Sequence, residues 1–510
     1  MEQKNTKTEL IVNDVIFNES AEQAIDADFT LPDYCPEISK ILKCRAISRI
    51  SSKSISARTV TVDGTITVTV IYCSENGRLC SFEYQYPFSK SIETGVEADG
   101  CLLNCTTRCE YINCRAVTSR KIDLHGAAAI SIKIIKRKST EIISDIDDKN
   151  IELLRGTAPA TTPMGFNEKY LIIEEKIELT QSQSNMCSVI RYDAVPIVKE
   201  CKILSGKVVI KGEISFSILC SGIDCPPQTV RSIIPFSQIL EIEGITDSCE
   251  CDTSAQIVYL EIKPQLDANG EAKALTVNAK ILVGCECYCN NDIDVVLDAF
   301  SRKFHAEIIK NDVCINKICR KINERFNCKK NLEFSDGSLS AVADMWCNVK
   351  VENIKLDTKC LEINGTVIAS IIAIDTEGLP SFYEKMIDFE YSCPIDLPNT
   401  NLRCDPIITV SSANYTITGS GNMEFRVELC VNAVIYEDIV IPLISDVEIN
   451  EKRPIESKSH SAMTIYFATS GESVWEIARK YCASIKEIKQ INDLNDETLE
   501  NDTMILVPMN

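Results

Sequence analysis

Cysteine is the residue type with the most evident chemical potential in this sequence. The chain has 26 cysteines among 510 residues, and five of them form two closely spaced groups, Cys249-x-Cys251 and Cys285-x-Cys287-x-Cys289. A spacing of two places side chains on one face of a β-strand. Zinc modules more often use paired C-x(2–4)-C motifs. We therefore predict free thiols and no metal ligands, with a metal site and late oxidative cross-linking as the alternatives.

Other catalytic chemistry has little support in the sequence. The three histidines (His125, His305 and His460) lie far apart, and there is no phosphate-binding loop, H-E-x-x-H motif or G-x-S-x-G motif. Acidic pairs such as Asp147-Asp148 are expected as solvated surface in a chain with 74 acidic residues. We predict that the protein is not an enzyme and has no catalytic residue and no cofactor. A carboxylate-based hydrolase is the alternative.

Charge and hydropathy limit the partners. The formal net charge is -21, which disfavours binding to nucleic acid and to anionic lipid. The first 20 residues lack the apolar core of a signal peptide, and no run of 18 apolar residues predicts membrane insertion. We expect the protein to stay in the compartment where it is made.

The sequence repeats itself three times. Three segments align without a gap, and each has a glycine followed 24 residues later by a phenylalanine. Apolar residues also recur two places before the glycine and two and six places after it. The segments are 62–89, 210–237 and 363–390, with Gly64, Gly212 and Gly365 as the glycines and Phe88, Phe236 and Phe389 as the phenylalanines.

The repeated pattern predicts β structure. Apolar residues alternate with polar ones on both sides of turn residues such as Asn76-Gly77, which indicates a hairpin. A second alternating pair follows each hairpin, and the shared glycine suggests a bulge or a close backbone approach. The expected fold is mainly β, with three separate antiparallel β domains. We place these at residues 1–155, with an N-terminal lead-in, 156–310 and 311–450.

Three short stretches outside the repeated hairpins are predicted to be helices or an extended lead-in. Residues 312–328 place Val313, Ile315, Ile318 and Ile322 near one helical face, and residues 144–155 are a weaker helical candidate. Residues 31–42 contain two prolines and predict an extended lead-in that packs on the first sheet.

The C-terminal residues form a different module. Residues 451–462 are polar and predict a linker. Beyond it, strand and helix patterns over 463–510 predict the order βααβ, with Ser473 as the N-cap of the first helix and Ser484 preceding the second.

This C-terminal segment resembles a LysM domain over almost its whole length. The matching residues are Gly471-Glu472-Ser473, Val474-Trp475-Glu476-Ile477-Ala478, then Ile485, Ile488, Asn492 and Leu494, and finally Ile505, Val507 and Pro508. Asp502 stands where a glycine is usual, and aspartate can tolerate positive φ. The resemblance implies a groove for N-acetylglucosamine polymers between the first strand–helix loop and the loop before the last strand.

The three β units resemble the SPOCS repeat of sporulation proteins. The glycine-centred hairpin and the lead-in Leu31-Pro32-Asp33-Tyr34-Cys35-Pro36 carry this resemblance. Three SPOCS repeats with a C-terminal LysM domain are similar to the clostridial SipL-type spore-coat morphogenesis proteins. This resemblance implies a scaffold in the mother-cell cytoplasm, at the forespore surface, whose LysM domain binds the coat-basement ATPase SpoIVA. Self-association of the β repeats is a further expectation.

Two functions are therefore weighed for the LysM segment. A protein scaffold would use an apolar anchor, and Trp475 is either core or a partly exposed anchor, with Met463 and Ile465 beside it. A peptidoglycan-binding protein would use the loop groove, with Tyr466 and Trp475 as aromatic platforms. The candidate binding residues are Ile465, Tyr466, Ser470, Gly471, Glu472, Ser473, Trp475, Asn501 and Asp502.

Overall fold

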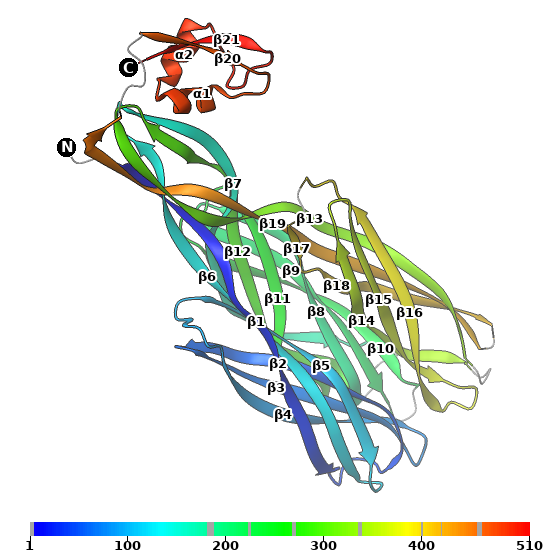
Figure 1. Ribbon diagram of the computed structural model, residues 1–510. Coiled ribbons are helices and arrows are strands. Elements are labelled where there is room, and N and C mark those ends of the chain that lie inside the picture. The colour runs from blue at the N-terminus through cyan, green and yellow to red at the C-terminus, as the bar shows by residue number, and fades with distance from the viewer. Residues whose placement is uncertain are drawn as a thin grey trace.

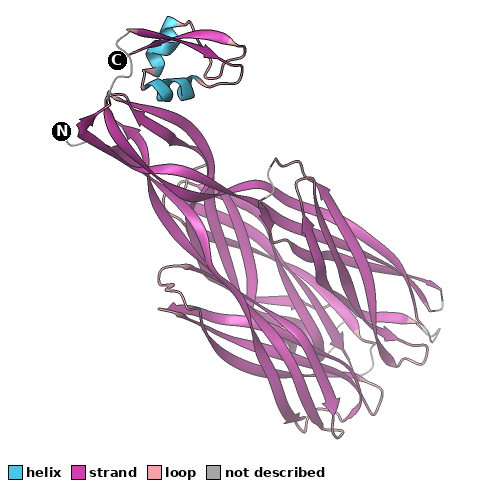
Figure 2. Cartoon of the chain, in the orientation of Figure 1, coloured by secondary structure: helices cyan, strands magenta, loops and turns pink. Residues whose placement is uncertain are grey.

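The chain is built almost entirely of antiparallel β-strands (Figures 1 and 2). Among the described residues, helices occur only in the C-terminal domain, which lies at one end of the molecule (Figure 2). The computed structural model describes residues 5–180, 188–222, 226–267, 272–334, 339–398, 401–419, 421–455 and 462–509.

Each repeat contains one three-stranded sheet that has the repeated glycine in its central strand. The strand order is the same in all three copies, so the third copy has the topology of the first two. The sheets are β2 (Ile38–Ser56), β3 (Thr59–Ser74) and β4 (Leu79–Glu93); β8 (Ser188–Leu204), β9 (Lys207–Ser221) and β10 (Gln228–Glu241); and β14 (Ala341–Leu356), β15 (Cys360–Ile374) and β16 (Pro380–Pro394).

The repeated glycine makes room for the repeated phenylalanine. Gly212 lies directly opposite Phe236 in the β9–β10 ladder, and a Cβ on Gly212 would stand 2.4 Å from the phenylalanine ring and 2.5 Å from the backbone oxygen of Ile197. The neighbouring strand has a β-bulge between Val198 and Glu200, next to the same glycine. The predicted bulge and close backbone approach are both present. Gly64 with Phe88 and Gly365 with Phe389 repeat this pairing.

A second sheet in each repeat is formed by longer strands. Its central strand pairs with one strand from before the glycine sheet and one from after it. These sheets are β1 (Asn5–Thr30), β6 (Lys121–Ile146) and β5 (Leu102–Ala116); β7 (Ile151–Glu178), β12 (Ala272–Ser301) and β11 (Glu250–Leu266); and β13 (Phe304–Glu333), β19 (Asn422–Pro454) and β18 (Ile407–Gly419), with the short β17 (Leu402–Cys404) also on β19.

Both helix predictions between the repeats are wrong. Residues 312–328 lie within β13, where Val313 and Ile315 are buried at the strand period of two. A register shift between Ile318 and Arg320 changes the phase, so that Ile322 is buried as well. Such a bulge produces spacings that resemble a helical face. Residues 144–155 end β6 and begin β7.

The three repeats do not form the three separate domains that we expected, because they share clusters of buried residues. Ile71, Leu219 and Ile372 each lie seven residues after the repeated glycine, and they pack in one cluster. A second cluster combines residues of the long strands: Leu10, Val12 and Ile142 from the first repeat, Ala158, Ala160 and Val295 from the second, and Val313, Ile315 and Leu443 from the third. The repeats therefore meet around common centres, with equivalent positions facing one another. The predicted boundaries at 155 and 310 fall inside β7 and β13.

The lead-in packs on the first repeat as predicted. Leu31, Cys35 and Ile38 are buried in the core of that repeat. The Leu31 amide donates to the carbonyl oxygen of Arg120 at 2.7 Å. This segment is therefore a structural connection between β1 and β2.

Four cysteines that we predicted to be free thiols form two disulfides that join β12 to the start of β11 and to Cys249, the residue just before β11. The pairs are Cys249–Cys289 and Cys251–Cys287. Cys251 lies directly opposite Cys287 in the antiparallel ladder, which brings the two side chains together on one face.

The C-terminal domain has the predicted order βααβ. Its elements are β20 (Met463–Ala468), α1 (Val474–Tyr481), α2 (Ile485–Ile491) and β21 (Thr503–Pro508). The predicted linker at 451–462 is described only in part: β19 continues to Pro454, and residues 456–461 lie outside the described residues.

Candidate functional site

The C-terminal domain is held in shape by its helix caps and a small core. Ser473 and Ser484 have extended backbones, and their side chains accept the amide protons of Glu476 and Glu487, which begins α1 and α2. Helix α1 ends at Tyr481 and is capped by Cys482, whose left-handed conformation (φ 51°) turns the chain toward α2. The two helices thereby cover one face of the β20–β21 sheet with buried residues such as Ile477 and Ile488.

The two loops of the candidate groove are joined to each other by hydrogen bonds. The Ser470 amide donates to Oδ1 of Asp502 at 2.8 Å, and its hydroxyl donates to the carbonyl oxygen of Glu500 at 2.7 Å. The Gly471 amide donates to the carbonyl oxygen of Leu499 at 2.8 Å. The amides of Ser470 and Gly471 therefore already have acceptors within the protein.

Asp502 does not take the positive φ that we considered for it. Its side chain instead accepts the hydrogen bond from Ser470, so the turn is stabilised by a carboxylate where LysM domains usually have a glycine. Asn501, beside it, is exposed.

Tyr466 and Glu472 form a polar pair at the edge of the same loops. The Tyr466 hydroxyl donates to Oε1 of Glu472 at 2.8 Å, and the Thr469 amide donates to Oε2 at 2.9 Å. The Thr469 hydrogen bond, with that of Tyr466, lowers the pKa of Glu472, and the bond to Glu472 raises the pKa of Tyr466. The Nζ of Lys480 lies 4.6 Å from the centre of the Tyr466 ring. This aromatic face is thus partly occupied by a cation.

Trp475 is not an exposed anchor. It is 8% exposed and packs edge-on against Phe300 of β12, with the ring centres 5.0 Å apart. Its indole Nε1 donates to Oδ2 of Asp298 at 3.3 Å, and Arg479 donates to the same oxygen at 2.6 Å. Trp475 therefore joins the C-terminal domain to the end of the second repeat.

The outer face of β20 is the exposed apolar surface of this domain. Met463, Ile465 and Phe467 alternate along the strand and are 49%, 55% and 76% exposed. Phe467 lies opposite Met504 of β21, which is 54% exposed. These four residues, the sheet-face patch, are the part of the domain best suited to an apolar partner.

The candidate residues thus fall into three places. Ile465 lies in the sheet-face patch, and Trp475 lies in the contact with the second repeat. The others belong to the loop region or its immediate supports: Tyr466, Ser470, Gly471, Glu472, Ser473, Asn501 and Asp502. Phe467 and Met504 were not named as candidate binding residues from the sequence. Phe467 could have been found, because it follows Met463 and Ile465 at the spacing of two that places side chains on one face of a strand.

Comparison with known families agrees with this architecture. The family model for the SipL SPOCS domain matches residues 37–117 and 186–265, and the model for the LysM domain matches residues 468–508. The third repeat lies outside these matches but shares the strand order of the other two. No curated protein and no solved structure matched the chain.

The matched families indicate which kinds of domain the chain contains. SPOCS domains belong to sporulation proteins, and LysM domains are binding modules of the peptidoglycan-binding type, so the domains found are non-catalytic binding domains. Within the described residues, no helix is long and apolar enough to cross a membrane. With SPOCS domains followed by a C-terminal LysM domain, the chain has the domain content of a SipL-type protein.

Proposed function

We propose that this protein is a non-enzymatic scaffold of spore morphogenesis whose LysM domain binds a protein partner through the sheet-face patch. The partner that the family resemblance suggests is the coat-basement ATPase SpoIVA. The place of action would be the mother-cell cytoplasm at the forespore surface.

The observation that carries this proposal is the contrast between the apolar patch and the loops. Phe467, Ile465 and Met463 offer apolar side chains to solvent along one strand. Burying such side chains contributes about 1.5–3 kcal/mol each at an interface with good complementarity. The loop amides of Ser470 and Gly471, by contrast, already have acceptors inside the domain.

A second candidate function is glycan binding, because LysM domains are of the peptidoglycan-binding type. The loop region keeps some features that suit a sugar, namely the Tyr466 ring and the exposed Asn501. A glycan in this groove would have to replace the hydrogen bonds from Ser470 to Asp502 and Glu500. That replacement costs affinity unless the sugar reproduces both bonds.

The test compares two variants of the full chain. We expect Phe467→Glu to weaken binding to purified SpoIVA by about 100-fold in biolayer interferometry, and Tyr466→Ala to change it little. Met386→Glu is the matched control, since Met386 is an exposed apolar residue of the third repeat, at 62% exposure.

The glycan alternative is tested with the same proteins. If the parent chain sediments with purified peptidoglycan, chitin oligomers compete, and Tyr466→Ala abolishes the effect while Phe467→Glu does not, the LysM domain is a glycan-binding module and the scaffold proposal is wrong.

A further inference from the structure

Six cysteines gather where the two sheets of the second repeat meet. β8 belongs to the glycine sheet, and β11 and β12 belong to the long-stranded sheet. Two disulfides connect the start of β11 to β12, and two further thiols beside them are free. The free thiols are Cys201 on β8 and Cys285 on β12; the disulfide cysteines are Cys249, Cys251, Cys287 and Cys289.

The sulfur atoms are close enough to share one metal ion. The Sγ atoms of Cys201, Cys251 and Cys285 all lie within 4.8 Å of one another, and Sγ of Cys285 lies 3.7 Å from Sγ of Cys287. A tetrahedral zinc site with Zn–S bonds of about 2.3 Å has sulfur atoms about 3.8 Å apart. The sulfur atoms of Cys201, Cys251 and Cys285 are therefore near the spacing of such a tetrahedron, and Cys287 lies beside Cys285. The sulfur atoms of Cys251 and Cys287 would have to separate once their bond is open.

Burial and access also suit a bound ion. Cys285 and Cys287 are buried, whereas Cys201 is exposed and lines a surface cavity of about 460 Å³ together with Cys251 and Lys321. The buried thiolates would shield the ion from water, and the cavity offers an entry path.

A hydrogen bond joins the thiols of Cys201 and Cys285. The carboxylate of Asp252, which lies next to both thiols, adds negative charge near the site.

We propose that the second repeat contains a zinc site that forms when a thiol reductant opens the Cys251–Cys287 disulfide. The Sγ atoms of Cys201, Cys251, Cys285 and Cys287 then bind one Zn²⁺. Two reductant thiols give up two electrons and two protons and become a disulfide, and these electrons and protons convert Cys251–Cys287 into two thiols. Zinc then displaces protons from the cysteine thiols, without changing its own oxidation state.

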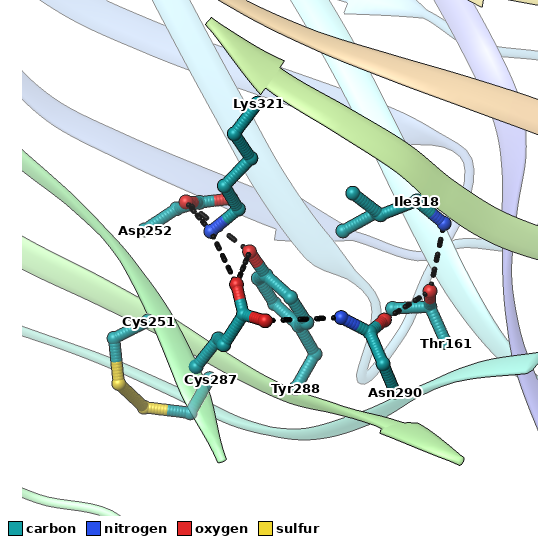
Figure 3. A network of polar contacts seen from close by, with 9 residues as sticks. Thr161, Cys251, Asp252, Cys287, Tyr288, Asn290, Ile318 and Lys321 are labelled. Carbon is teal, nitrogen blue, oxygen red and sulfur yellow. Dashed lines mark hydrogen bonds and ion pairs between the residues drawn. A yellow bond between two sulfur atoms is a disulfide. The ribbon is translucent and has the colours of Figure 1, made fainter. Parts of the chain in front are cut away.

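The site would join parts of the molecule that the disulfide alone does not join. The disulfide links β11 to β12 within one sheet, whereas zinc would add β8 of the other sheet through Cys201. Figure 3 shows the Cys251–Cys287 disulfide beside Lys321, which comes from β13 of the third repeat. The Lys321 ammonium pairs with Asp252 at 2.8 Å, so the third repeat lies directly against this site.

The experiment uses the full chain, reduced with dithiothreitol and freed of reductant by anaerobic gel filtration. Co²⁺ is the spectroscopic probe, and Zn²⁺ content is measured by elemental analysis. We expect one ion per chain, with the thiolate-to-cobalt charge transfer and visible bands of a tetrahedral sulfur site, and we expect Zn²⁺ to displace the Co²⁺. The unreduced chain should not give this spectrum.

Variants assign the ligands. Cys201→Ser and Cys285→Ser should each weaken Zn²⁺ binding at least about tenfold. Cys114→Ser is the matched control, because Cys114 belongs to a hydrogen-bonded thiol pair with Cys44 in the first repeat, and it should bind as the parent does. Because Cys201 is exposed, its serine variant should fold even if that of the buried Cys285 does not; circular dichroism checks this.

Three outcomes would overturn the proposal. The first is that the reduced chain takes up no Co²⁺ or Zn²⁺. The second is that Cys201→Ser binds as tightly as the parent. The third is a spectrum of an iron–sulfur cluster or of octahedral oxygen ligands in the freshly purified or loaded protein.

Discussion

The two faces of the C-terminal domain use aromatic residues in opposite ways. On the helical face, Trp475 is buried against Phe300 and Asp298 of the second repeat. On the sheet face, Phe467 is 76% exposed and has no such cover. Residue type alone favours tryptophan as the interface anchor. The structure shows that the tryptophan makes a contact within the chain, whereas the phenylalanine is free to meet a partner.

The largest expected loss of partner affinity comes from a change in the sheet-face patch. Phe467→Glu places a charge on the most exposed residue of the sheet-face patch, and we expect SpoIVA affinity to fall by about 100-fold, which is typical of a hot-spot residue. Biolayer interferometry with the full chain measures this. Thr464→Ser, a mild change on the inner side of the same strand, should leave the affinity unchanged.

A change in the helical face should weaken the contact between the C-terminal domain and the second repeat. Asp298→Ala removes the acceptor of both Trp475 and Arg479, and we expect the docked arrangement to lose about 1–3 kcal/mol. Amide hydrogen exchange in α1 should become faster, while SpoIVA affinity should change less than about threefold.

Asp298→Asn is the conservative control for this change, since its side-chain oxygen can still accept from Trp475. If Asp298→Ala abolishes SpoIVA binding as strongly as Phe467→Glu does, the two faces do not act separately and the comparison fails.

The loop region should show a smaller effect. Asp502→Ala removes the acceptor of the Ser470 amide, so exchange of that amide should accelerate about fivefold, corresponding to about 1 kcal/mol. Hydrogen exchange followed by mass spectrometry measures this. SpoIVA affinity should stay at the parent value; a large loss would place the partner on the loops instead of on the sheet.

The smallest effect concerns pH. Burial raises the pKa of Glu152, which accepts hydrogen bonds from Ser484 and the Ile485 amide and lies near Arg302 and Glu487. Because the pKa of Glu152 in the docked state lies above its ordinary value of 4.5, the contribution of this group to docking is fully present below pH 4.5 and is lost as pH rises through the raised pKa.

Tryptophan fluorescence in a Trp346→Phe background reports on Trp475 alone, because the chain has two tryptophans. The signal should change with pH in the parent, and Glu152→Gln should flatten the profile. An unchanged profile in the glutamine variant would assign the pH response to another group.

Local patterns predicted the features that depend on local interactions. The pairing of Gly212 with Phe236 follows from a fixed offset along one hairpin, and the caps at Ser473 and Ser484 follow from neighbours three residues away. These features repeat or match a family signature, so one sequence was enough to find them.

Features that depend on distant segments could not be predicted in this way. Trp475 meets Asp298, 177 residues away in the sequence, and no local pattern connects them. The bulge between Ile318 and Arg320 changes the phase of β13, which made a strand resemble a helix. The disulfide partners Cys251 and Cys287 depend on the register of two strands, which spacing alone does not give.

The shared cluster around Ile71, Leu219 and Ile372 has a consequence for how the chain matures during translation. Two of these residues are synthesised long before the third, and Leu443 of the second shared cluster emerges later still. A nascent chain that has finished only two repeats would expose part of these apolar clusters to solvent. Chaperone dependence, or sensitivity to premature stop codons, should therefore rise after the second repeat and end once β19 has left the ribosome.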